Sequence, residues 1–197
     1  MSEIMDQPFV ISIIGLSSSG KTAQGRRLYE CLNRLPGCAS LELIDGDSVR
    51  EFLKGKIGYT ASDRKLSAAV QTQLAHMLYK HGISSIVCNI SPFEESRQFA
   101  RKKIPGLVEI HLDCPLQTCM QRDRELQKNV YEPVLAGRTS DVNIVGVDIE
   151  FETPDDADLV LRTDLQSENE SFYKIIEFLE AKWGTSLAPN SLRSTGT

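Results

Sequence analysis

Metal-type cysteine spacing, long apolar runs and excess positive charge are all missing from this chain of 197 residues, and each absence excludes a class of protein. The five cysteines form no C-x-x-C pair, which argues against a zinc module and favours reduced thiols. No apolar run approaches the roughly 18 residues of a membrane span, and Met1–Pro8 is polar and acidic, unlike a signal peptide. A net charge of −5 disfavours a nucleic-acid surface. We therefore expect a cytoplasmic protein without membrane or nucleic-acid partners.

What is present is a regular alternation of apolar runs and helical patterns, which predicts a parallel sheet covered by helices. The expected strands span residues 9–14, 40–44, 83–90, 107–112 and 159–161. The expected helices span residues 21–35, 48–53, 62–81, 93–103, 115–122 and 167–183. The predicted fold class is α/β, with three layers, a five-stranded parallel sheet and helices on both of its faces.

The chain length suits one domain, which we place at residues 1–187. Residues 123–157 interrupt the alternation with charge, glycine and proline, which predicts a lid over a binding site. The polar residues 188–197 predict a disordered tail. In the longest helix we expect Ser62 to be the N-cap and Gly82 to end the helix. Its apolar residues recur on one face at Leu66, Val70, Leu74, Met77 and Leu78.

The most specific motif follows the first expected strand. Gly15-Leu16-Ser17-Ser18-Ser19-Gly20-Lys21-Thr22 fits the phosphate-binding pattern G-x-x-x-x-G-K-[ST]. The glycines let backbone N–H groups close around phosphate oxygens, and the next helix presents its positive end to the same anion. Lys21 would reach the β- and γ-phosphates, and the Thr22 hydroxyl would bind Mg²⁺. The motif predicts a P-loop NTPase fold that binds a nucleoside triphosphate.

Polar residues follow three further strands, and the carboxyl ends of parallel strands meet at one edge of a sheet. These residues are Asp45-Gly46-Asp47, Asn89-Ile90-Ser91-Pro92 and Asp113. A kinase needs a carboxylate to position Mg²⁺ or to accept the proton of the attacking hydroxyl, which makes Asp45 and Asp47 candidates. An ordinary turn with Asp47 as a helix cap is the alternative. Arg50 and Arg64 have the planar fork that suits phosphate or sulfate oxygens.

Together these motifs resemble those of adenylyl-sulfate (APS) kinases. Besides the phosphate-binding loop, the matching segments are Asp45-Gly46-Asp47-Ser48-Val49-Arg50, Gly58-Tyr59-Thr60, Asp63-Arg64-Lys65, Ile90-Ser91-Pro92-Phe93, Asp113-Cys114-Pro115-Leu116 and Gln121-Arg122-Asp123. The resemblance extends from residue 9 to residue 163. It implies that ATP gives its γ-phosphate to the 3′-hydroxyl of adenylyl sulfate, which yields 3′-phosphoadenylyl sulfate (PAPS), the activated sulfate donor.

The same resemblance implies a role for each matching residue. Residues Gly15–Thr22 and Arg122 would bind ATP, with Mg²⁺ on Thr22 and on one of the two aspartates. The catalytic residues would be Lys21, Asp45, Asp47 and Ser91. The acceptor would be bound by Arg50, Tyr59, Arg64, Ile90, Ser91 and Ile144. We expect Ser91 to shape the acceptor pocket and not to form a phosphoserine, because in-line transfer needs only positioning and charge stabilisation.

Departures from the family pattern fall mainly on the acceptor side. Ser67, Ala69 and Val70 stand in place of an asparagine and two arginines, and Ile144 stands in place of a phenylalanine that stacks on the acceptor adenine. A related kinase with another small nucleotide-like or sugar-like acceptor is therefore an alternative. A nucleotide-dependent switch or binding module is an alternative of another class, although the sequence contains no N-K-x-D motif of GTPases. The oligomeric state stays open, with a homodimer as one option.

Overall fold

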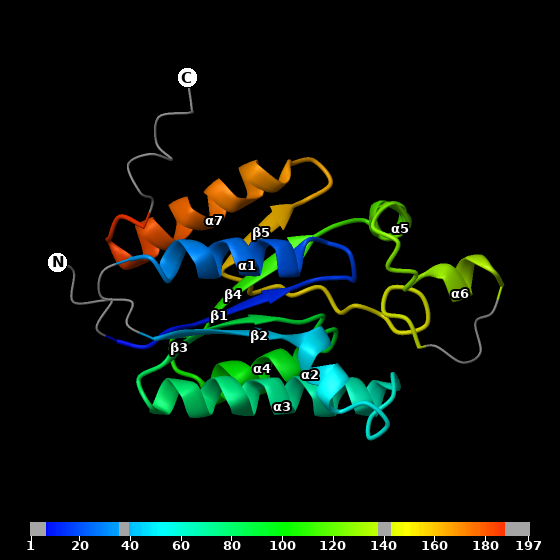
Figure 1. The fold of residues 1–197 in the computed structure, drawn as a ribbon, viewed down its shortest axis with the longest axis horizontal. Helices are drawn as coiled ribbons and strands as arrows, with labels where there is room; N and C mark the ends of the chain where they lie inside the picture. Colours follow the sequence, from blue (N-terminus) through cyan, green and yellow to red (C-terminus); the bar gives the residue numbers. More distant parts are fainter. Residues whose placement is uncertain (1–6, 36–39, 138–142, 188–197) are drawn as a thin grey trace.

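The computed structural model describes residues 7–35, 40–137 and 143–187, and a five-stranded sheet lies at its centre (Figure 1). The strands are β1 (Val10–Ile14), β2 (Leu41–Asp45), β3 (Ser84–Cys88), β4 (Val108–Asp113) and β5 (Leu159–Arg162). Their order in the sheet is β2-β3-β1-β4-β5, and every neighbouring pair is parallel. The helices cover both faces of this sheet, so the predicted three-layer α/β fold is confirmed.

The helices form two layers and one smaller group at an end of the sheet. They are α1 (Lys21–Leu32), α2 (Gly46–Phe52), α3 (Ala61–Lys80), α4 (Glu94–Lys103), α5 (Leu116–Glu125), α6 (Glu132–Leu135) and α7 (Glu168–Trp183). Helices α1 and α7 cover one face of the sheet, and α3 and α4 cover the other (Figure 1). Helices α5 and α6 lie beyond the same end of the sheet as the loop that joins β1 to α1.

The central position of β1 follows from its composition. Every residue of β1 and β3 is buried, as expected for parallel strands with helices on both faces. On one side of the sheet, Ile11 and Ile13 join a cluster with Leu28 of α1 and Leu179 of α7. On the other side, Val10 packs in a cluster near α3 and α4. The apolar strand thereby fixes the point at which the phosphate-binding loop begins.

Several predicted boundaries are wrong by a few residues, for local reasons. Helix α2 begins at Gly46 because the Asp45 side chain accepts a hydrogen bond from the Asp47 N–H at 2.9 Å and caps the helix. Strand β3 ends at Cys88, which leaves residues 89–92 as a loop beyond the carboxyl end of this strand. Helix α5 continues to Glu125, and α6 was not expected from the sequence.

Helix α3 was predicted correctly from its apolar repeat, but its cap and its packing differ from the expectation. Thr60, not Ser62, is the N-cap, because Thr60 and Asp63 form a reciprocal capping box. Gly82 has a φ of +77° after the last turn, which confirms its predicted role. The apolar residues Leu66 and Met77 are each 52 % exposed. The opposite face is buried, and its residues are Arg64, Ser67, Ala68, Gln71, Thr72 and Ala75. The buried face of the helix therefore consists of small and polar residues, not of the apolar repeat.

Two predicted segments lie partly or wholly outside the described residues. The expected lid at 123–157 includes residues 138–142, which are not described, and the predicted tail at 188–197 is not described at all. The described parts of 123–157 hold the end of α5, the short α6 and an isolated bridge between Val145 and Ile149. Among the described residues, no helix has the length and apolar character needed to cross a membrane.

Candidate active site

The loop between β1 and α1 has the backbone of a phosphate-binding loop. Gly15 has a φ of +144°, Ser18 of +61° and Gly20 of +108°. A Cβ atom on Gly15 would lie 2.6 Å from the carbonyl oxygen of Leu112, so only glycine fits this close approach of two strands. The buried Ser18 and Ser19 complete the turn into α1, whose N-terminus carries the positive end of the helix dipole. The loop is therefore built to hold an anion.

Lys21, in the first turn of α1, is directed back over this loop. Its Nζ donates a hydrogen bond to the carbonyl oxygen of Leu16 at 2.6 Å, and the residue is only 9 % exposed. Burial lowers the pKa of Lys21 to about 8, while nearby Asp47 partly opposes this shift and the positive charge of Lys128 adds to it. A bound phosphate would favour the charged form of the lysine. Lys21 thus has the position and the charge to contact phosphate.

A cavity of about 390 Å³ opens above the loop, between the carboxyl ends of the strands, α3 and α5. Such a volume is typical of a small-molecule site. Most of the residues predicted from the sequence line it: Ser17, Ser18, Ser19, Gly20, Lys21, Thr22, Asp45, Asp47, Arg50, Arg64, Ile90, Ser91 and Arg122. Four predicted residues do not: Gly15, Leu16, Tyr59 and Ile144. One cavity therefore brings together nearly all of the candidate site.

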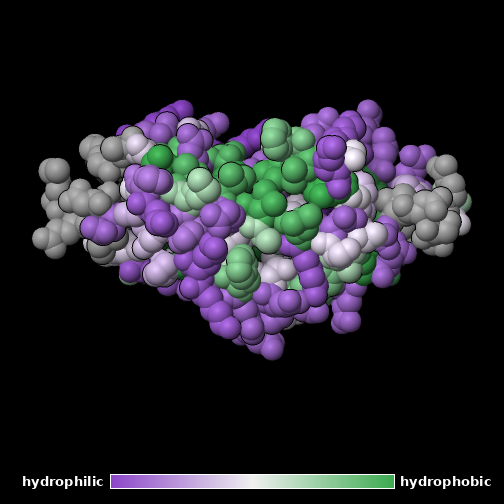
Figure 2. All heavy atoms as spheres, turned by 90° about the horizontal axis from the view of Figure 1, so that it is seen from below, coloured by the Kyte–Doolittle hydropathy of each residue, from purple (hydrophilic) through white to green (hydrophobic). Residues whose placement is uncertain are grey.

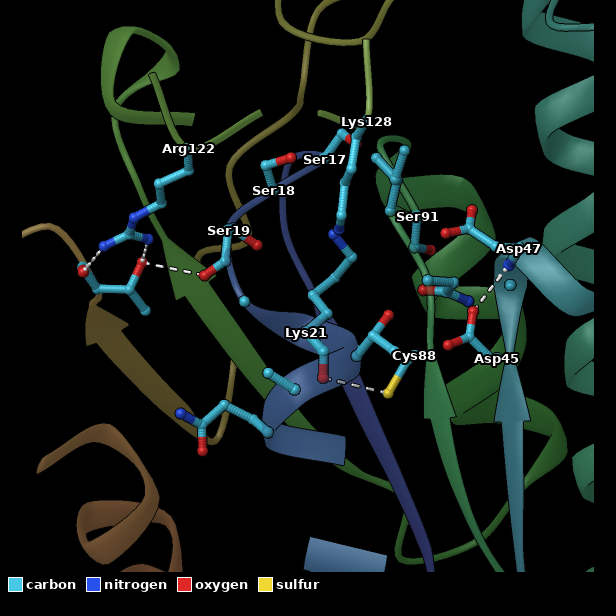
Figure 3. A pocket seen from close by; sticks show the side chains of 18 of the residues that line it. Ser17, Ser18, Ser19, Lys21, Asp45, Asp47, Cys88, Ser91, Arg122 and Lys128 are labelled. Carbon is cyan, nitrogen blue, oxygen red and sulfur yellow. Dashed lines mark hydrogen bonds between the residues drawn. The ribbon is translucent and has the colours of Figure 1, made fainter. Parts of the chain in front are cut away.

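Asp45 and Asp47 lie side by side at the end of β2, across the cavity from Lys21 (Figure 3). The helix cap is Asp45, so the alternative reading of Asp47 as the cap is wrong. Thr22 and the two carboxylates offer the hard oxygen ligands that Mg²⁺ prefers. Among the described residues, no three metal-ligating side chains come together. A magnesium ion here would therefore need phosphate oxygens and water as its other ligands, as is usual in kinases.

Ser91 occupies the next strand end under backbone strain. Its φ of +42° is unusual for a residue other than glycine. Arg97, at 2 % exposure, donates a hydrogen bond from Nη1 to the Ser91 carbonyl oxygen at 2.9 Å and also pairs with Glu94. This buried contact holds Ser91 in place at the cavity wall. Ser91 lines the same cavity as Asp47 (Figure 3).

Arg50 and Arg64 flank the ring of Tyr59. Their guanidinium carbons lie 4.8 Å and 5.6 Å from the ring centroid, at cation–π distance. Arg50 donates to the carbonyl oxygen of Gly58, and Arg64 donates to those of Tyr59 and Asn143. Burial lowers the pKa of Arg64 to about 10, with the charge of Arg50 as a second cause. Both arginines line the cavity, whereas the tyrosine, which contacts both of them, does not line it.

Ile144 lies in a different environment from the one expected of an acceptor contact. The residue is 3 % exposed and belongs to an apolar cluster with Cys114, Cys119 and Tyr131. Its N–H donates to the Asp148 carboxylate at 2.8 Å, which fixes the surrounding turn. The side chain therefore packs in the protein interior beside the cavity in this conformation.

Arg122 closes the opposite side of the cavity. It extends from α5 to the loop after β5, where its guanidinium donates to the backbone and the hydroxyl oxygen of Thr163. The Thr163 hydroxyl in turn donates to the carbonyl oxygen of Ser19 at 3.2 Å (Figure 3). This chain of contacts ties α5 to the phosphate-binding loop.

No role was assigned from the sequence to several residues that line the cavity or contact its loop. Asp123 is 1 % exposed, and its carboxylate accepts hydrogen bonds from the Ser18 hydroxyl and the Tyr131 N–H. Its position directly after Arg122 was the available signal. Lys128 lines the cavity together with Lys21 but belongs to a segment without regular periodicity. Gln71 also lines it, although nothing in the apolar pattern of α3 distinguished this position.

Comparison with known proteins agrees with this geometry. The sequence profile of the adenylylsulphate kinase family matches residues 7–162. A probable adenylyl-sulfate kinase from Archaeoglobus fulgidus is 36% identical over 79% of this chain and 96% of that protein. A cytidine diphosphoramidate kinase from Campylobacter jejuni is 35% identical over 87% of this chain and 95% of that protein.

A solved structure is similar as well. The APS kinase of Mycobacterium tuberculosis, in complex with AMPPNP and APS, aligns with a TM-score of 0.77 and 30% identity over 88% of this chain and 98% of that one. The P-loop and the paired aspartates lie within the residues that the family profile matches. The chain belongs to the adenylylsulphate kinase family.

Proposed function

We propose that this protein transfers the γ-phosphate of ATP to the 3′-hydroxyl of adenylyl sulfate and so forms PAPS. The observation that carries the proposal is the single cavity in which the phosphate-binding loop faces Asp45 and Asp47. A loop for the donor phosphates and carboxylates for the acceptor hydroxyl are the two halves of a phosphoryl-transfer site. The relative from Mycobacterium tuberculosis, which was solved with AMPPNP and APS, supports this choice of substrates.

In this mechanism the charged residues position the groups and stabilise the transition state. Lys21 and Lys128 neutralise negative charge on the transferring phosphoryl group. Thr22 and one of Asp45 and Asp47 would hold Mg²⁺, which we propose as the cofactor, and the ion would supply positive charge beside the phosphates. The other aspartate accepts the proton of the attacking hydroxyl. Arg50 and Arg64 hold the acceptor on its anionic side, where two guanidinium groups suit sulfate or phosphate oxygens.

A second acceptor has specific support. The relative from Campylobacter jejuni, a cytidine diphosphoramidate kinase, is about as similar to this chain as the probable APS kinase from Archaeoglobus fulgidus. The acceptor side of this chain also carries Ser67, Ala69 and Val70 where APS kinases have an asparagine and two arginines. A cytidine nucleotide with a modified diphosphate is therefore the alternative acceptor.

The deciding experiment compares the two acceptors directly. Purified protein is incubated with ATP, Mg²⁺ and either adenylyl sulfate or cytidine diphosphoramidate, and the 3′-phosphorylated product is quantified by mass spectrometry. We expect PAPS to form with the higher kcat/KM. The Lys21→Ala variant is the inactive control, with its fold checked by circular dichroism. Faster phosphorylation of the cytidine compound would replace the proposed acceptor, and no acceptor-dependent ATP consumption would contradict a kinase.

We further propose that the protein is a cytoplasmic homodimer. The described cysteines are free thiols, which suits a reducing compartment in which ATP is available.

Exposed apolar residues gather on the outer face of α3 and α4 (Figure 2), namely Leu66, Leu74, Met77 and Phe99. Such a face suits contact with a second copy of the chain. Light scattering should give the mass of a dimer, and Leu74→Glu should reduce it to that of a monomer.

A further inference from the structure

Gln71 is a buried polar residue of the cavity with one end of its amide unpaired. It is 3 % exposed, and its Nε2 donates a hydrogen bond to the Ser67 hydroxyl at 3.1 Å. Its Oε1 has no hydrogen-bond partner among the described residues. Buried polar atoms in native proteins are nearly always paired, so an exception at a binding cavity points to a ligand group.

The unpaired oxygen lies next to Gly46, the residue between the paired aspartates. Gly46, between Asp45 and Asp47, packs so tightly that a Cβ atom there would be 2.9 Å from the Cys88 carbonyl oxygen and 3.4 Å from Gln71 Oε1. Gln71 lines the same cavity as both carboxylates. The amide oxygen therefore lies beside the backbone that joins the two carboxylates, one of which is the base for the acceptor hydroxyl.

The fixed amide also determines what kind of group it can recognise. Because Nε2 is used by Ser67, the amide presents an acceptor, and it needs an O–H or N–H donor from the ligand. The hydroxyl that is phosphorylated gives its proton to a carboxylate. In a ribonucleotide, a second hydroxyl lies on the neighbouring ring carbon and can donate a hydrogen bond to another oxygen near the catalytic carboxylate.

We propose that Gln71 is a specificity-determining residue whose Oε1 accepts a hydrogen bond from the ribose hydroxyl adjacent to the one that is phosphorylated. This inference rests on the proposed function and names its substrate class more closely, as a ribonucleotide and not a deoxyribonucleotide. Ser67 is the positioning residue that keeps the amide oxygen directed at the sugar. Gln71 and Ser67, which both belong to α3, would thereby recognise the sugar of the acceptor.

The test compares adenylyl sulfate with its 2′-deoxy analogue in wild-type protein and in Gln71→Met, which keeps the side-chain length without the amide. We expect wild-type protein to prefer the ribose compound by about tenfold in kcat/KM, which is the value of one good hydrogen bond. Gln71→Met should lose this preference by slowing only with the ribose compound. Gln71→Glu, which retains an acceptor oxygen, should keep it. Gln73→Met, at an exposed position of the same helix, is the matched control.

The outcomes separate this inference from the proposed function. If wild-type protein phosphorylates both compounds equally, or if Gln71→Met slows both by the same factor, the inference is wrong while PAPS formation stands. If adenylyl sulfate is not phosphorylated at all, the proposed function fails. The same ribose and deoxyribose comparison with cytidine diphosphoramidate then decides the role of Gln71, since equal rates with Gln71→Met and wild type would again reject it.

Discussion

The ammonium group of Lys21 is hydrogen-bonded at 2.6 Å to the backbone oxygen of Leu16, within the loop that the lysine itself follows. The lysine is thus held over the phosphate site before any phosphate arrives. Its charge is destabilised by burial, which lowers its pKa to about 8. These two facts make nucleotide binding dependent on pH.

We expect the affinity for ATP to fall as the pH rises above about 8. In the free protein Lys21 loses its proton as the pH passes through its pKa of about 8, whereas bound phosphate favours the charged form, so binding takes up a proton at high pH. Titration calorimetry in buffers of different ionisation enthalpy measures this uptake. Lys21→Arg, which stays charged, is the control. An affinity that is constant between pH 7 and pH 9 would contradict this assignment.

Asp45→Asn and Asp47→Asn should each lower the turnover number by about 100-fold or more, with little change in ATP affinity. Asparagine is as good an N-cap as aspartate, so Asp45→Asn should leave α2 and the melting temperature intact. A magnesium titration then distinguishes the two residues, because only the variant of the metal-binding aspartate should need more Mg²⁺. Wild-type turnover in both variants would leave the pair with a structural role alone.

Arg50→Ala and Arg64→Ala should both raise the KM for the acceptor and leave the KM for ATP unchanged. They should differ in stability. Arg64 is 8 % exposed and holds the carbonyl oxygens of Tyr59 and Asn143, so its loss should cost about 1–3 kcal/mol of unfolding free energy. Arg50 is less buried, and its removal should cost less. Steady-state kinetics and chemical denaturation test both expectations, and a raised KM for ATP would reverse the assignment of donor and acceptor sides.

Ile144→Phe should destabilise the protein by about 1–3 kcal/mol, because the larger ring overpacks the cluster around Cys119 and Tyr131. From the sequence alone the same change would be expected to restore stacking on the acceptor base. Ile144→Val, a smaller change in the same cluster, provides the comparison. Thermal unfolding and the acceptor KM are measured together. A lower acceptor KM with an unchanged melting temperature would instead show that this side chain meets the acceptor.

The sequence was sufficient for the fold and for most of the cavity, because both depend on short-range patterns. The apolar β1, the Gly-Lys-Thr sequence and the aspartates after β2 are encoded by neighbouring residues. Contacts between distant segments were not predictable in this way. The Arg64 bond to Asn143 and the burial of Ile144 both depend on how a long connection returns to the cavity. The buried side of α3 could not be chosen from its apolar repeat, because that side consists of small and polar residues whereas Leu66 and Met77 are exposed.

The position of β1 at the centre of the sheet has a consequence for how the protein folds. Its neighbours β3 and β4 come much later in the chain, whereas the strand that follows it, β2, is not its neighbour. During synthesis, the phosphate-binding loop therefore emerges early, but the strand before it has no neighbouring strand to pair with until β3 and β4 have left the ribosome. Such non-local pairing makes folding slow. A truncated chain that ends before β3 should not bind ATP, even though it contains the complete phosphate-binding motif.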